Sequence, residues 1–228
     1  MVVVPTYNER ENLSKLIPKI LSEKIPGVKF KIIVVDDNSP DGTAKVAKRF
    51  SSVVLLSRPK KLGLGSAYLA GFKKAIELRA DVVFSMDADL SHDFSYSKAF
   101  VEKIRKGADV VIGSRYVPGG GTNWTVDRKI ISGGANFLAK LILGVPANDL
   151  TSGFRCYRAS LLKKVVNVKF KSTSYSFLEE MIYYCHKNSA KIAEVPIFFA
   201  DRVSGKSKLR KLEILKFPFT LLRLRFFS

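Results

Sequence analysis

The chain has 228 residues, 46% of them apolar, and carries a formal net charge of +19. This length suits one large domain or a domain with an appendage, the composition does not indicate a disordered chain, and no apolar run reaches the roughly 18–20 residues of a membrane span. The positive charge is concentrated after residue 114, where 20 Lys/Arg stand against 7 Asp/Glu. We therefore expect an anionic partner, which is nucleic acid, a phosphorylated substrate or an acidic lipid surface.

The first 115 residues predict strands that alternate with helices. Short runs rich in Val and Ile, apolar at consecutive positions, are typical of strands covered on both faces, as in a parallel sheet. The predicted strands are MVVVP, KFKIIVVDD, SVVLLS, DVVFSMD and DVVIGSR, and the predicted helices span 11–23, 42–50, 65–78 and 94–106. Ser39 is expected to cap the second helix, with Pro40 at its first position. The predicted fold is α/β, a doubly wound and mostly parallel sheet with helices on both faces.

The regular alternation ends at Arg115. The glycine-rich segment YVPGGGTNWTVD predicts a functional loop, and further helices are predicted over 127–143 and around 176–187, followed by a strand in KIAEVPIFFA. From Arg202 onward, eight Lys/Arg and one Asp/Glu are mixed with Leu, Ile and Phe. This mixture predicts a basic amphipathic segment at a membrane interface over 210–228, and the alternative is a packed terminal helix with a solvated face. The apolar C-terminal end is compatible with a membrane domain that followed it.

The cysteines and histidines do not predict a metal site. Cys156 and Cys185 lack metal-ligand spacing and are expected to be buried free thiols in a reducing compartment. His92 and His186 are far apart in the sequence, and His186 lies in a predicted helix, where a structural role is expected.

Two acidic residues, Asp87 and Asp89, end the apolar run in FSMDADLSHD. In an extended strand both would point to one side while Ala88 points to the other. Paired carboxylates without histidine or thiolate suit Mg²⁺ or Mn²⁺, which keeps positions open for substrate phosphates. The alternative is an exposed acidic turn. Further acids follow the first two strands, and ligands of such sheets bind beyond the carboxyl ends of the strands, which favours the metal interpretation.

Eight segments occur in the order found in glycosyltransferase family two: VVPTYNERENL, VVDDNSPDGT, GLGSAYLAGF, MDADLSH, IGSRY, DRKIISGGAN, DLTSGFRCYR and DRVSGKSKL. The set most resembles the dolichol-phosphate mannose synthase branch, although polyprenyl-phosphate glucosyltransferases share most of it. The resemblance implies a GT-A type fold and inverting transfer of mannose from GDP-mannose to polyprenyl (dolichyl) phosphate, giving a β-linked product. UDP-glucose or another UDP-sugar is the alternative donor. A nucleic-acid-binding module is a distant alternative, because strand-end acids would repel phosphate.

The resemblance also implies roles for individual positions. The nucleotide sugar would be bound by Pro5, Tyr7, Glu9, Val35, Asp36, Asp37, Asp87, Ala88, Asp89, Arg202 and Lys208. The divalent cation, Mg²⁺ or Mn²⁺, would be held by Asp87, Asp89 and Ser91, where some relatives have glutamine in place of Ser91. The acceptor phosphate would be bound by Arg115, Arg128 and Ser132, and the residues implied in catalysis are Asp89, Arg115 and Arg202.

The implied acceptor removes the need for a general base, because a phosphate monoester is already anionic at neutral pH and can attack the anomeric carbon directly. We expect a catalytic domain over 1–209, with a nucleotide-sugar half (1–114) and an acceptor half (115–209), followed by the interfacial segment 210–228. The expected location is the cytoplasmic face of a membrane. The expected partners are the sugar donor, the lipid phosphate and the membrane surface, and not nucleic acid.

Overall fold

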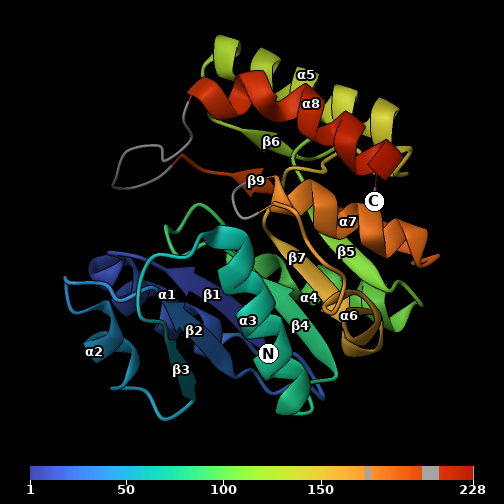
Figure 1. Ribbon diagram of the computed structural model, residues 1–228. Coiled ribbons are helices and arrows are strands. Elements are labelled where there is room, and N and C mark those ends of the chain that lie inside the picture. Colours follow the sequence, from blue (N-terminus) through green and yellow to red (C-terminus); the bar gives the residue numbers. More distant parts are fainter. Residues whose placement is uncertain (173–175, 202–210, 228) are drawn as a thin grey trace.

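Seven strands form the central sheet in the order β3-β2-β1-β4-β7-β5-β8 in the computed structural model, which describes residues 1–172, 176–201 and 211–227 (Figure 1). The strands are β1 (Val2–Thr6), β2 (Ile32–Asp36), β3 (Val53–Ser57), β4 (Val82–Ser85), β5 (Val110–Ser114), β7 (Arg155–Arg158) and β8 (Ile192–Pro196). All neighbours pair in parallel except β7, which runs antiparallel between β4 and β5. The mostly parallel sheet is confirmed, but β7 was not predicted, because its sequence RCYR contains no apolar run.

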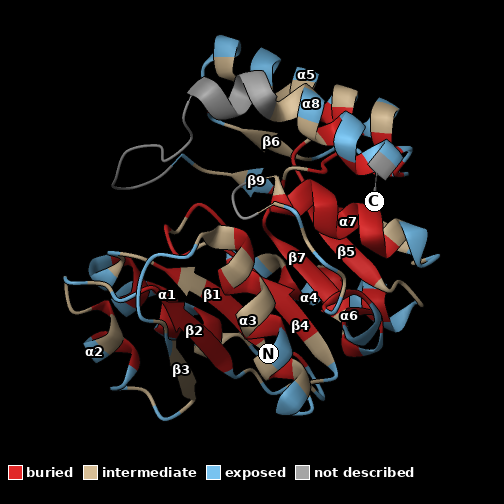
Figure 2. Cartoon of the chain, viewed as in Figure 1, coloured by how far each residue is buried: buried red, intermediate tan, exposed pale blue. Residues whose placement is uncertain are grey.

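Helices cover both faces of the sheet, because alternate strand residues point to opposite sides. On one face, strand residues such as Val3 and Ile33 pack against α3 (Leu64–Glu77), α6 (Ala159–Val165) and α7 (Phe177–Lys187). On the other face, Val2 and Val34 belong to the core formed with α1 (Arg10–Ser22), α2 (Thr43–Ala47) and α4 (Ser97–Arg105), which follows the short 3₁₀ helix η1 (Phe94–Tyr96). Figure 2 shows the inner strands mostly buried between these layers, whereas the edge strand β3 is of intermediate burial. Cys185 lies in the first core and Cys156 in the second, both as buried free thiols, as predicted.

The predicted cap of α2 by Ser39, with Pro40 as its first residue, is wrong, although the start predicted at Gly42 is within one residue. The helix begins at Thr43, after Gly42, whose positive φ of 88° suits glycine. The hydroxyl of Ser39 instead donates to Asp36 (2.6 Å) and accepts from the backbone N–H of Asn8 (2.9 Å). Ser39 therefore joins the loops after β1 and β2, because the Asp36 carboxylate is a stronger acceptor than a neutral partner.

Helices α5 (Val126–Leu143) and α8 (Lys211–Phe227) lie side by side as a separate layer at one end of the molecule (Figure 1). They pack through one apolar cluster that contains Ala139, Leu143, Leu221 and Leu224. A small sheet of β6 (Gly121–Thr122) and β9 (Phe198–Phe199) lies between this layer and the main sheet, so the predicted strand over 191–200 is divided between β8 and β9. Within the described ranges, no helix is both long and apolar enough to span a bilayer.

Candidate functional site

The ends of β1 and β2 lie next to each other, with Pro5 opposite Val35 and Thr6 opposite Asp36. Asp36 is buried, and its carboxylate accepts hydrogen bonds from the Thr6 hydroxyl (3.0 Å) and from the hydroxyl and backbone N–H of Ser39 (2.6 and 3.0 Å). Pro5 is partly exposed at this edge, whereas Val35 is fully buried in the core. The burial of Val35 gives no support to its predicted contact with a nucleotide, and the roles of Pro5 and Asp36 stay predictions.

Asp37 forms a buried ion pair that was not predicted from the sequence. The guanidinium of Arg58 lies 2.5 Å from Asp37 Oδ1, and the backbone N–H of Leu62 donates to Oδ2 (3.0 Å). Arg58 also donates to the hydroxyl of Ser66 at the start of α3 (2.8 Å). The Asp37 carboxylate therefore fixes the loop between β3 and α3. Its own orientation is fixed by the same hydrogen bonds before any nucleotide binds.

Tyr7 and Glu9 follow β1 on the same edge. The ammonium group of Lys61, from the loop that Asp37 fixes, lies over the Tyr7 ring at 4.7 Å. Glu9 accepts a hydrogen bond from the Asn12 side chain (2.8 Å) at the start of α1. The structure thus brings the predicted nucleotide-binding residues of both strands to one edge and adds a cation beside an aromatic ring. Their contacts with a nucleotide remain predictions.

The acidic pair lies in a loop, whereas an extended strand was expected from the sequence. Strand β4 ends at Ser85, and Leu90 has a positive φ of 64°, a conformation that a leucine rarely adopts. Ala88 is buried in the core beneath α1 and α4, so it does point away from the solvent side, as predicted. The loop turns sharply after Asp89, which bends the chain back over the end of the strand that precedes Asp87.

Each carboxylate of the pair receives a hydrogen bond that fixes its orientation. The Tyr68 hydroxyl donates to Asp87 Oδ1 (3.0 Å), and Asp89 Oδ1 accepts from the hydroxyl (2.5 Å) and backbone N–H (3.1 Å) of Ser91. Gly153 leaves space beside Asp87, because a Cβ at that position would lie 3.6 Å from both carboxylate oxygens. In the part of the chain that the structure describes, no group of three His, Cys, Asp or Glu could hold a metal. Two hard carboxylates nevertheless fit Mg²⁺ or Mn²⁺ shared with a diphosphate.

His92 connects the acidic pair to the cationic part of the site. Its Nδ1 accepts a hydrogen bond from the backbone N–H of Asp87 (3.3 Å), and its ring stacks on Phe154 and meets Phe199 edge-on. Burial lowers the pKa of His92 below its ordinary value although the nearby carboxylates oppose this, and the cation of Arg115 adds to the lowering. A neutral imidazole agrees with the acceptor role of Nδ1. Sequence reasoning missed this residue, which lies only five positions after Asp87.

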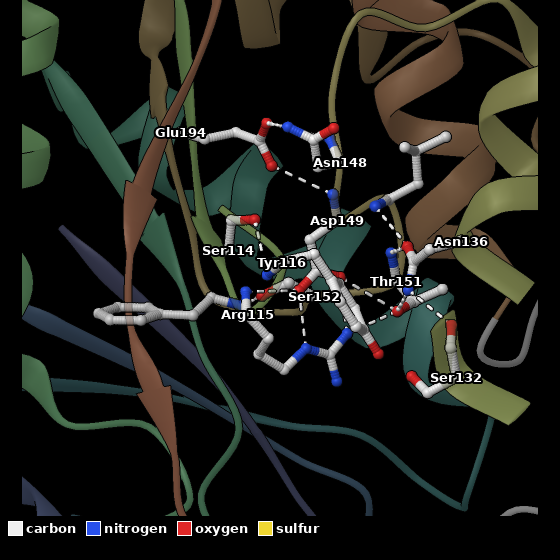
Figure 3. Close-up of polar contacts among 12 residues, drawn as sticks. Ser114, Arg115, Tyr116, Ser132, Asn136, Asn148, Asp149, Thr151, Ser152 and Glu194 are labelled. Carbon is white, nitrogen blue, oxygen red and sulfur yellow. Dashed lines mark hydrogen bonds and ion pairs between the residues drawn. The ribbon is translucent and has the colours of Figure 1, made fainter. Parts of the chain in front are cut away.

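Arg115 is buried rather than solvated, with 9% of its surface exposed, and is paired with Asp149 (Figure 3). Its Nε and backbone N–H donate to Asp149 Oδ2 (2.7 and 3.0 Å), and its Nη2 donates to Oδ1 (2.6 Å) and to the Thr151 hydroxyl (2.6 Å). Burial lowers the pKa of Arg115, but the charge of Asp149 outweighs burial, so the pKa lies above its ordinary value. Asp149 opens the segment DLTSGFRCYR, which gave no local signal for this contact.

Trp124 brings Arg115 and Arg128 together. The two guanidinium carbons lie 5.1 and 4.0 Å from the centre of its ring, and Arg128 also pairs with Asp201 (3.0 Å). Ser132, one turn further along α5, accepts a hydrogen bond at its carbonyl oxygen from Asn136. The three residues predicted for the acceptor phosphate therefore gather around one indole ring and one helix. Two further predicted residues, Arg202 and Lys208, lie outside the described residues.

A buried arginine and a buried glutamate lie behind the site and were not predicted. Arg155 has no exposed surface, and it donates to the backbone carbonyls of Leu178 (2.7 Å) and Leu150 (2.5 Å). Burial raises the pKa of Glu179 to about 7, although the charge of Arg155 opposes this. Within the described ranges, Glu179 Oε2 and Arg155 Nε have no hydrogen-bond partner. Arg155 therefore links the loop after α5 to the start of α7.

Known proteins resemble this chain in sequence and in fold. Residues 1–166 match the model of glycosyl transferase family 2. The chain is 39% identical over 215 residues to the polyprenol monophosphomannose synthase of Mycolicibacterium smegmatis, which covers 92% of this chain and 80% of that protein. It is 39% identical over 214 residues to the undecaprenyl-phosphate mannosyltransferase of Micrococcus luteus, with 92% and 86% covered. Glucosyl-3-phosphoglycerate synthase from Mycobacterium tuberculosis shares the fold, with a TM-score of 0.69 at 20% identity over 98% of this chain and 78% of that one.

Proposed function

Because the chain belongs to glycosyltransferase family 2, and is a glycosyltransferase, we propose that it transfers mannose from GDP-mannose to the phosphate of a membrane polyprenyl phosphate. The names of the two relatives at 39% identity support mannose as the sugar and a polyprenyl phosphate as the acceptor. The observation that carries the proposal is the division of the site into an acidic side, with Asp87 and Asp89, and a cationic side around Arg115, joined by His92. The nucleotide-sugar half would be 1–114 and the acceptor half 115–209.

On the donor side, Asp87 and Asp89 would hold a divalent cation. When bound, the cation neutralises charge on the diphosphate that leaves with the nucleotide. A structural neighbour of the same fold was crystallised with Mn²⁺ and UDP-glucose, which supports a divalent cation here. Tyr68 and Ser91 orient the carboxylates toward this task, since each donates to one of them. Ser91 would therefore act through Asp89 rather than as a full third ligand.

On the acceptor side, Arg115, Arg128 and Ser132 would bind the lipid phosphate. Asp149 balances the charge of Arg115 and holds its guanidinium in a fixed plane, so the group can position a phosphate oxygen without rearrangement. That oxygen forms a bond to the anomeric carbon while the bond to the diphosphate breaks, and the electron pair leaves with the nucleoside diphosphate. No proton has to move, so no residue is needed as a general base, and the sugar carbon is inverted.

The outer face of α5 supports membrane association. Val126, Ile130, Phe137 and Leu141 are spaced by four, seven and four residues, which places them on one side of the helix. The exposed fractions of these four residues lie between 68% and 72%. Beside α5, the exposed residues of α8 include Phe219, Leu222, Arg223, Arg225 and Phe226. We propose that this layer contacts the cytoplasmic face of a membrane, and that the interfacial surface includes α5 as well as 210–228.

A transfer assay with matched donors and acceptors tests the reaction. Purified protein with Mn²⁺ is given GDP-mannose, UDP-glucose or UDP-N-acetylglucosamine, with polyprenyl phosphate or the corresponding polyprenol, and products are identified by mass spectrometry. We expect mannosyl phosphoryl polyprenol from GDP-mannose and none from the alcohol. Transfer from UDP-glucose alone would replace the proposed donor. Equal transfer to the alcohol, or a pH–rate profile that requires one deprotonated carboxylate, would contradict the mechanism without a base.

Liposome flotation tests the membrane surface. Phe137→Glu combined with Leu141→Glu should weaken binding to anionic vesicles at least tenfold, because each buried side chain is worth about 1.5–3 kcal/mol. Leu78→Glu is the control. Leu78 is also exposed, but it follows α3 and precedes β4, so it does not belong to the layer of α5 and α8. Equal flotation of both variants would exclude α5 from the membrane contact.

A further inference from the structure

Few residues of helix α5 are fully buried against the rest of the protein. Of its 18 residues, the buried ones are Asn136, Ala139 and Leu143. Ala139 and Leu143 belong to the apolar cluster shared with α8, whereas Asn136 is the polar member of the buried stripe. Helix α5, which we propose lies on the membrane, therefore makes its buried polar contact with the site through Asn136.

All polar groups of the Asn136 side chain are used in this contact (Figure 3). Its amide oxygen accepts from the backbone N–H groups of Leu150 (2.8 Å) and Thr151 (3.2 Å). Its amide nitrogen donates to the Ser132 carbonyl and to the Thr151 hydroxyl (both 3.0 Å). The side chain thus holds the loop over 148–153 by its backbone, which an apolar residue of the same size could not do.

The same loop is held from the sheet by Glu194 of β8. Glu194 accepts from the backbone N–H of Asn148 (2.9 Å) and of Asp149 (3.1 Å). Asp149 is therefore clamped between a strand of the sheet and a helix of the outer layer, and it in turn positions Arg115 with hydrogen bonds of 2.6 to 3.0 Å. Thr151 connects both sides, because its hydroxyl accepts from Arg115 Nη2 and from Asn136 Nδ2.

We propose that Asn136 is a positioning residue that fixes Arg115 relative to the membrane-facing helix α5. This inference rests on the proposed function, in which a lipid phosphate is presented by the bilayer on which α5 lies. A phosphate anchored in the bilayer has a restricted depth, so the distance between the bilayer and the guanidinium of Arg115 has to be set by the protein. The chain of hydrogen bonds from α5 through Asn136, Thr151 and Asp149 sets that distance. A water-soluble phosphate acceptor carries no such restriction and can follow a displaced guanidinium.

The test compares Asn136→Ala with Asn188→Ala, using two acceptors. Asn188 is the control, because its amide also donates to a carbonyl four residues earlier, that of Tyr184, but it is exposed at the end of α7, and among the described residues its side chain has no hydrogen bond to a site loop. One acceptor is long-chain polyprenyl phosphate in phosphatidylcholine and phosphatidylglycerol vesicles. The other is a water-soluble short-chain prenyl phosphate. For each protein, kcat and KM are measured for both acceptors and for the donor.

For Asn136→Ala we expect kcat/KM with the vesicle acceptor to fall about tenfold or more, since loop N–H groups lose their partner. The fall with the soluble acceptor should be several times smaller, and the donor KM should stay within about twofold of wild type. Thr151→Val keeps the hydrogen bond from the backbone N–H of residue 151 to Asn136 but removes the one that the Thr151 hydroxyl accepts from Asn136. It should change the ratio of kcat/KM for the two acceptors in the same direction but less. It also tests the inference if Asn136→Ala does not fold.

Equal losses of kcat/KM with both acceptors in Asn136→Ala, or a loss of the same size in Asn188→Ala, would overturn the inference. The proposed function would still stand in that case, as long as the wild-type protein transfers the sugar. If neither Asn136→Ala nor Thr151→Val changes the ratio of the two acceptors, the inference is likewise wrong. A wild-type protein that forms no product with either acceptor overturns the proposed function itself, and the inference with it. The wild-type arm therefore distinguishes the two failures.

Discussion

Replacing Asp149 by alanine removes the carboxylate that neutralises Arg115. Three hydrogen bonds of 2.6 to 3.0 Å are lost, and the guanidinium keeps its charge at a site where only 9% of the residue is exposed. Breaking a buried ion pair by removing one partner typically costs about 3–5 kcal/mol, because the remaining charge is left without compensation. We therefore expect Asp149→Ala to lower the free energy of unfolding by about that amount.

The exposed pair of Arg128 and Asp201 provides the matched control. Its side chains are 41% and 53% exposed, compared with 7% and 0% for Arg115 and Asp149. Water and salt screen such a pair, so Asp201→Ala, which also removes the acidic partner, should change the free energy of unfolding by no more than about 1 kcal/mol. The contrast between the two pairs isolates burial as the cause of the larger effect.

Urea denaturation followed by circular dichroism measures both variants. The double variant Arg115→Met with Asp149→Leu should recover much of the stability lost in Asp149→Ala, because no charge then remains buried. A loss below about 1 kcal/mol in Asp149→Ala, or a double variant that is no more stable than Asp149→Ala, would refute the reasoning.

Three further changes test other contacts. Burial raises the pKa of Glu179 from 4.5 to about 7, so its contribution to stability is fully present below about pH 4.5 and is lost as the pH rises through 7. Glu179→Gln should remove this loss, worth about 3 kcal/mol between about pH 5 and pH 8, and parallel urea-denaturation profiles of variant and wild type would contradict the assignment. Tyr68→Phe removes the donor to Asp87 and should raise the Mn²⁺ concentration for half-maximal activity about tenfold; an unchanged Mn²⁺ titration would show that the hydrogen bond does not tune the site. Gly71→Ala places a Cβ 2.3 Å from Val3 and should lower the Tm. Gly134→Ala places its Cβ in open space within helix α5 and should raise the free energy of unfolding by up to about 1 kcal/mol. A Gly71→Ala variant that is more stable than Gly134→Ala would contradict the packing.

Local patterns in the sequence predicted the parts of the fold that depend on neighbouring residues. Consecutive apolar residues such as Val2 to Val4 and Ile32 to Val35 occur where a strand is covered on both faces, and the structure divides them between the two cores. The acids after β1, β2 and β4 were expected at one edge, because parallel strands end on the same side. The helix ends of α1 and α3 fall within one residue of the prediction.

The contacts that make up the site could not be read from such patterns. Arg115 and Asp149 are 34 residues apart in the chain, and β7 enters the sheet between β4 and β5 although its sequence begins and ends with arginine. A charged side chain can be buried only where partners from distant segments surround it, and its own neighbours in sequence do not specify them. The sequence by itself determined which strand ends carry acids and that the second half is basic. The tertiary structure decided which of these charges are paired inside the protein, because pairing depends on distances that arise only when segments far apart in the chain pack together.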